Sequence, residues 1–193
     1  GRLEQRDVSN LTGEVCCVEP RLSQAEWILG KYWSNDFAMV FSKLGTVNQE
    51  LQQIVTSGEM AEEAGARLDR DLGYMTVHLS NTLGDARGYL PDVPHVHYLI
   101  GYLDQVRESV NVHRGLNAQR PLTAEERATF RQYAELSHEL IGIVQEYYPD
   151  YSGNGGFTSD DSYWVLGFLS DARWREALSR MDAKANEAGF MAR

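Results

Sequence analysis

Glu135 and His138 have the spacing with which some helical proteins hold two iron ions. In di-iron carboxylate bundles this Glu-x-x-His motif occurs on two helices, and two further inward-facing Glu complete the ligand set. This chain contains the motif once, and both residues fall off the apolar stripe of their expected helix. The sequence therefore predicts a solvated or rim pair here, without a metal.

His95 and His97 form a second candidate metal site, close to Asp92 and Pro94. In a loop, His-x-His can bind zinc with a carboxylate as third ligand, whereas on a helix the two rings point apart. Proline favours the first turn of a helix. We therefore expect both His in the first turn of a helix, and no metal.

Nucleophilic catalysis requires a Ser, Cys or Thr presented beside a base, and no such elbow is recognisable. The glycine-rich residues 153–156 follow a helical pattern and match no phosphate-binding loop, so we interpret them as a hinge. A disulfide between the neighbours Cys16 and Cys17 would be strained, and we expect neither to act in the domain core. The sequence thus predicts no catalytic residue and no cofactor.

Charge favours a protein partner. The 193 residues include 18 Lys and Arg against 28 Asp and Glu, a formal charge of −10. Such a field repels nucleic acid and is poorly suited to an anionic membrane surface. No apolar run approaches the roughly 20 residues that span a bilayer. We therefore expect that any membrane anchor is missing from this chain.

Apolar residues recurring every three or four positions predict long helices. A capping box at Ser23 and Glu26 predicts a first helix over about 24–56, and a second such box, at Thr123 and Glu126, predicts the start of a later one. His113 falls near an apolar-stripe position. The other helices are expected at about 59–90, from about 95 to 115, at 124–148 and, with a break near 170, at 160–188.

Short connections between these elements predict an all-α fold, an antiparallel bundle of four long helices plus a C-terminal helical segment. Leu79 and Leu103 are expected in its core. Residues 21–193 then form one domain, and residues 1–20 are an extension of unknown order.

Tryptophans cluster toward the two ends of the chain, where the first and last helices can meet. One interpretation is that they are core residues. The other is an exposed surface for a protein partner. The candidate partner surface comprises Trp27, Trp33, Trp164 and Trp174.

The order of several helix features is similar to that of a known family. A long helix opening with aromatic residues from Tyr32 is followed by a long helix that ends in Leu-Pro at 90–91. Next come Tyr-Leu-Asp-Gln-Val at 102–106 and, one helix later, Pro-Leu-Thr-Ala-Glu-Glu at 121–126. Over about residues 32–144, the chain resembles the N-terminal helical domain of the spore germination protein YpeB family.

This resemblance implies a non-catalytic domain outside the cytoplasmic membrane of the spore. Proteins of the family carry an N-terminal membrane anchor and support the stability and placement of SleB, an enzyme that cleaves spore cortex peptidoglycan. The expected partner is therefore a SleB-like cortex-lytic enzyme. The family's C-terminal PepSY-type domains have no counterpart in this sequence, and the family supplies no catalytic residue to transfer.

Two other functions stay open at this point. The chain can be the ligand-sensing bundle of a membrane receptor, which shares long antiparallel helices. It can also be a metal-dependent bundle enzyme. The sequence does not give the oligomeric state.

Overall fold

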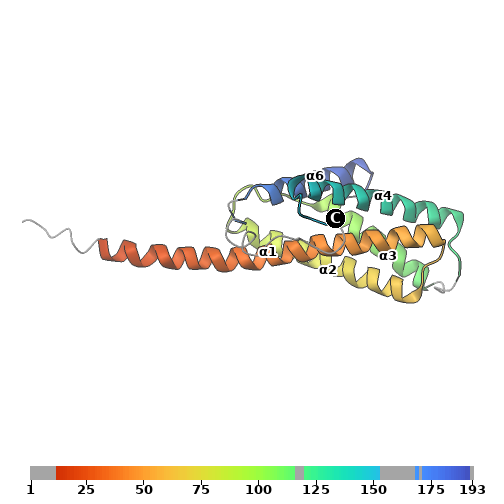
Figure 1. Cartoon of the computed structure of the whole chain (residues 1–193), viewed down its shortest axis with the longest axis horizontal. Coiled ribbons are helices and arrows are strands. Elements are labelled where there is room, and N and C mark those ends of the chain that lie inside the picture. Colours follow the sequence, from red (N-terminus) through yellow and green to blue (C-terminus); the bar gives the residue numbers. More distant parts are fainter. Residues whose placement is uncertain (1–11, 116–119, 153–167, 170, 192–193) are drawn as a thin grey trace, which may run out of the picture.

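The computed structural model describes residues 12–115, 120–152, 168–169 and 171–191. Within these residues the chain forms helices α1 (Thr12–Ser57), α2 (Glu62–Arg87), α3 (His97–Gly115), α4 (Ala124–Tyr147) and α6 (Arg173–Glu187). The predicted fold class is confirmed as all-α, with four long helices in a bundle and a further C-terminal helix (Figure 1).

Helices α4, α1, α2 and α3 pack side by side in that order, and α6 completes a ring by packing against both α3 and α4. Asp182 on α6 also caps α3, because its Oδ1 accepts hydrogen bonds from the backbone N–H groups of Tyr98 (2.8 Å) and Leu99 (2.9 Å). These N–H groups lie in the first turn of α3, where no intrahelical acceptor is available.

The core is made by the apolar stripes that the sequence predicts. Leu79 and Leu103 are fully buried, as expected. Aromatic rings join α1 and α6 inside the bundle, since the ring centroids of Phe37 and Trp174 lie 5.0 Å apart. Tyr151, which follows α4, donates a 2.6 Å hydrogen bond from its hydroxyl to the carbonyl of Phe41.

Helix α1 begins earlier than predicted, at Thr12 instead of near residue 24. The capping-box interpretation of Ser23 is therefore wrong, because Ser and Glu three residues apart are also compatible with a helix interior. Pro20 lies inside α1, although proline removes one helical hydrogen bond. The end of α1 is close to the prediction, since Gly58 adopts a φ of 74° directly after it, a conformation that glycine tolerates well.

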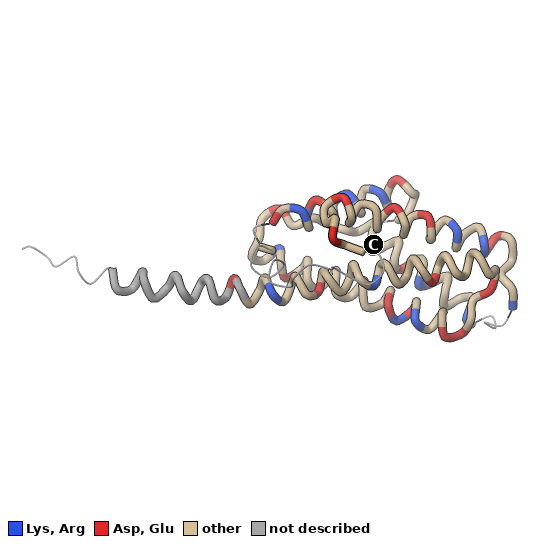
Figure 2. The backbone as a smooth tube through the Cα atoms, in the orientation of Figure 1, with Lys and Arg blue, Asp and Glu red and all other residues tan. Residues whose placement is uncertain are grey.

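The first part of α1 projects beyond the other helices (Figure 1). At 1.5 Å per residue, its 46 residues span about 69 Å, whereas the 26 residues of α2 span about 39 Å. Acidic and basic residues lie along every helix of the bundle (Figure 2). The excess of acidic residues is therefore spread over the bundle.

Candidate functional site

The start of α4 is organised by the predicted second capping box. Thr123 Oγ1 accepts a 3.2 Å hydrogen bond from the backbone N–H of Glu126, and Glu126 Oε2 accepts a 2.8 Å bond from the N–H of Thr123. The reciprocal pair satisfies two N–H groups at the start of α4. It also fixes the Glu126 side chain in one place.

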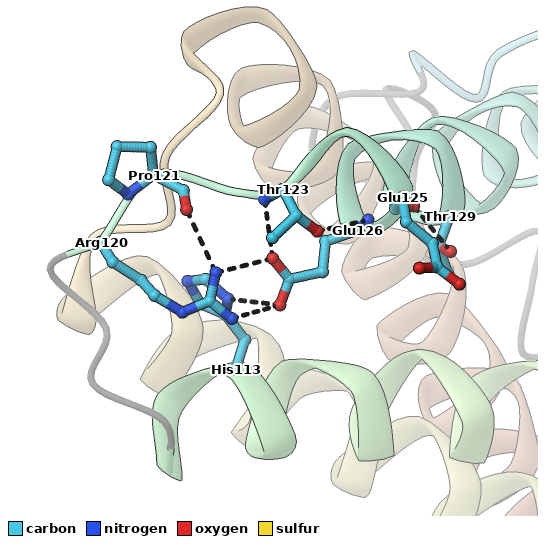
Figure 3. Close-up of polar contacts among 7 residues, drawn as sticks. All are labelled: His113, Arg120, Pro121, Thr123, Glu125, Glu126 and Thr129. Carbon is cyan, nitrogen blue, oxygen red and sulfur yellow. Dashed lines mark hydrogen bonds and ion pairs between the residues drawn. The ribbon is translucent and has the colours of Figure 1, made fainter.

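Two further side chains converge on this carboxylate (Figure 3). The Arg120 guanidinium donates from Nη1 to Oε2 at 2.8 Å and from Nη2 to Oε1 at 2.5 Å. His113, near the end of α3, places Nδ1 3.4 Å from Glu126 Oε1. We call His113, Arg120, Thr123 and Glu126 the junction cluster.

The junction cluster stabilises the ionised form of Glu126. The hydrogen bonds from Arg120 are the largest cause and hold the pKa of the Glu126 carboxyl well below its usual range, although partial burial acts in the opposite direction. The bonds from Thr123 and His113 lower the pKa further. Bidentate pairing of guanidinium and carboxylate is among the stronger charge-assisted arrangements in proteins.

His113 is 1% exposed, and its Nε2 has no hydrogen-bond partner among the described residues. A His beside a carboxylate is the arrangement of many general bases. Here the carboxylate is already occupied by Arg120, and Nε2 is buried instead of facing solvent. The described geometry therefore favours a structural junction over a proton-transfer centre.

Arg127, one residue after the junction cluster, ties α4 to the end of α1. Its Nε donates to the carbonyl of Val55 at 2.8 Å, and its Nη2 donates to that of Thr56 at 3.1 Å. The N–H of Leu122 donates to the carbonyl of Gly58 at 2.9 Å. These contacts join the start of α4, and Leu122 just before it, to the end of α1.

Beside the junction cluster lies a groove between α3 and α4, with a volume of about 360 Å³. It arises because α6 and the segment after it fill only part of the space between these helices. Phe190 packs against Tyr102 and Tyr133, with ring centroids 5.1 and 6.0 Å away. These residues do not line the groove, which lies beside the junction cluster. The residues of this α3–α4 groove are Glu108, Ser109, Val112, His113, Glu125, Glu126, Thr129 and Phe130.

The lining of the α3–α4 groove is acidic and apolar. Glu108 and Glu125 are exposed on its two sides. Val112 is 56% exposed, whereas Phe130 is buried at 2%. Ser109 Oγ lies 2.9 Å from Tyr133 Oη, within hydrogen-bonding distance. The groove can therefore accept an apolar group that carries positive charge.

A second polar cluster joins α1 and α2. Asp36 accepts a 2.7 Å hydrogen bond from Thr82 Oγ1, and its Oδ1 lies 3.3 Å from His78 Nδ1. The His78 ring stacks on Tyr74 with centroids 3.9 Å apart. Burial, with the nearby Asp36 charge, raises the pKa of Tyr74. The cluster does not line the α3–α4 groove, and it serves as a polar contact between two helices.

Among the described residues, neither pair of candidate metal ligands gains a third ligand. Glu135 and His138 are both exposed on α4, as predicted. His97 begins α3, but His95 precedes it, so the expectation that both lie in the first turn is wrong for His95. Their rings stack at 5.2 Å, and the described residues contain no group of three His, Cys, Asp or Glu arranged to hold a metal ion.

The structure corrects the tryptophan surface. Trp33 is 1% exposed and Trp174 is 0% exposed, so these two are core residues and cannot form a partner surface. Trp174 donates from Nε1 to the carbonyl of Phe168 at 3.0 Å and stacks on its ring. The Trp27 side chain and Trp164 lie outside the described residues.

Comparison with known proteins gives no match: no family model, no curated protein and no solved structure is similar to the chain. No helix in the described part of the chain combines the length and hydrophobicity that crossing a bilayer requires.

Proposed function

We propose that the chain is a non-catalytic helical interaction domain that binds a protein partner through the α3–α4 groove. The observation that carries this proposal is the groove itself, which is open beside the hydrogen-bonded junction cluster and has acidic sides and an exposed apolar residue. Interaction sites commonly combine an apolar centre with a charged rim. Because the rim here is acidic, the partner should present a basic and apolar segment.

The contacts around the groove support this proposal. Residues of the junction cluster line the groove, and Arg127 fastens the same turn to α1. A surface that is already ordered loses less conformational entropy on binding. The net charge of −10 additionally favours a basic partner over nucleic acid or an anionic membrane.

The resemblance to YpeB-like proteins suggests which partner to test. We propose a cortex-lytic enzyme of the SleB type, bound outside the cytoplasmic membrane in the inner-membrane or cortex region of the spore. The first experiment is purification of the tagged chain from sporulating cells in mild detergent. A wall hydrolase should be recovered with it, and its absence would contradict this choice of partner.

A charge reversal tests the groove. Glu125→Lys should weaken binding of the purified enzyme by about tenfold, because it places a cation opposite a basic segment. Asp85→Lys makes the same change on the exposed surface of α2 and should leave affinity unchanged. Isothermal titration calorimetry measures both dissociation constants. Equal affinities of the two variants would rule out the groove, even if the complex forms.

A further inference from the structure

The apolar stripe on the bundle-facing side of α1 ends where the helix leaves the bundle. From Ile54 back to Trp33, apolar residues alternate in steps of three and four, and each is at most 2% exposed. The same steps continued toward the N-terminus reach Gly30, Glu26 and Ser23. Glu26 is exposed. The bundle-facing stripe is therefore not apolar in the projecting part of α1.

A second apolar stripe replaces it, displaced by one residue. Its spacing is three, four, three, four, three, which is the heptad pattern of a coiled coil. Its described members differ in burial, since Leu29 is half-buried and Tyr32 is 55% exposed. The stripe consists of Val15, Val18, Leu22, Ala25, Leu29 and Tyr32.

The second stripe loses its apolar character inside the bundle. The next positions of the heptad are Asp36, Met39 and Lys43. Asp36 pairs with His78, and Lys43 Nζ lies 3.0 Å from a carboxylate oxygen of Asp71 on α2. The two stripes thus exchange roles between residues 29 and 33, where the helix emerges. We infer from this exchange that the projecting stripe serves a partner outside the bundle.

We propose that this partner is a second copy of the chain, and that the projecting parts of two α1 helices form a parallel, in-register coiled coil. A displacement of one residue rotates the stripe by about 100° from the bundle-facing side. Each bundle would therefore lie beside the dimer axis and not between the two helices. Pro20 occupies a heptad position on the opposite side from the stripe, which keeps it out of the contact.

Charge favours the parallel arrangement. In parallel register, Arg21 of one copy flanks Glu26 of the other, and symmetry makes this pair twice. Glu14 and Glu19 flank each other in the same way, also twice, and offset this gain, whereas the antiparallel arrangement gains no opposite-charge pair at all. In the antiparallel arrangement with full overlap, Glu19 of one copy lies beside Glu26 of the other and Arg21 lies beside Ile28, so it contains no compensating pair.

Light scattering after size-exclusion chromatography tests the dimer across a concentration series up to roughly 100 µM. The wild-type mass should rise toward twice 21.8 kDa. Leu22→Glu should remain monomeric, because it introduces a charge into the stripe. Gln24→Glu adds the same charge outside the stripe and should still dimerise, and far-UV circular dichroism should show that both variants keep their helices.

Cysteine crosslinking tests the orientation. In a Cys16→Ser, Cys17→Ser background, Leu22→Cys should form an intermolecular disulfide on oxidation, because parallel register places residue 22 against itself. Gln24→Cys in the same background should not crosslink efficiently. A wild-type chain that is monomeric at every concentration, or a dimer that Leu22→Glu leaves intact, would overturn the proposal. A dimer without crosslinking at residue 22 would overturn the parallel register.

Discussion

Replacing Asp182 by alanine should lower the free energy of unfolding by about 2–3 kcal/mol. Asp182 accepts hydrogen bonds from the N–H groups of Tyr98 and Leu99, at 2.8 and 2.9 Å. A hydrogen bond contributes about 0.5–1.5 kcal/mol net, and more when one partner is charged. A negative charge at a helix N-terminus adds roughly 0.3–1 kcal/mol. Because Asp182 is only partly buried, water replaces part of the lost contact, which keeps the sum below its upper limit.

Urea denaturation followed by circular dichroism measures this loss. Asp182→Asn retains a hydrogen-bond acceptor but not the charge, so it should lose roughly half as much. Asp85→Ala, on the exposed surface of α2, should change stability by no more than about 0.5 kcal/mol. Amide exchange at Tyr98 and Leu99 should accelerate in Asp182→Ala. A variant as stable as the wild type, with both amides still protected, would refute the capping argument.

Three other changes probe the core, the junction cluster and the segment after α4. Leu79→Ala and Leu103→Ala should each cost about 2–5 kcal/mol in denaturant unfolding, because each removes a fully buried side chain; unchanged midpoints would contradict their place in the core. Glu126 has a lowered pKa in the folded state, so its contribution to stability is complete above about pH 4.5 and decreases as the pH falls below that value. The stability difference between wild type and Glu126→Gln should therefore narrow on acidification, and a difference constant with pH would argue against the ion pair. Tyr151→Phe removes the bond to the carbonyl of Phe41 and should cost about 1 kcal/mol in thermal unfolding, whereas no shift in the midpoint would show that this bond is not needed.

Local sequence patterns were sufficient to predict that the helices exist and that a capping box lies in the candidate site. The apolar spacing that marks Leu79 and Leu103 as core depends only on neighbouring turns of one helix. The capping box of Thr123 and Glu126 is also local, since both residues lie in the first turn of α4. The start of α1 was not predicted, because Ser23 and Glu26 satisfy the same pattern inside a helix.

Contacts between distant residues could not be predicted. Nothing near Asp182 in the sequence indicates that it caps a helix that begins 85 positions earlier. His113 falls at an apolar-stripe position, which signals burial, but its pairing with Glu126 depends on how α3 meets α4. The tryptophans illustrate the same limit, because composition cannot distinguish a core aromatic residue such as Trp174 from one on an interface.

The placement of α6 also has a consequence for synthesis. A ribosome releases the chain from its N-terminal end, so α6 emerges after the helices that it covers. Until then the first-turn amides of α3 lack their acceptor, and the apolar sides of α3 and α4 stay uncovered. The nascent bundle should therefore remain susceptible to proteases and available to chaperones until α6 has left the exit tunnel.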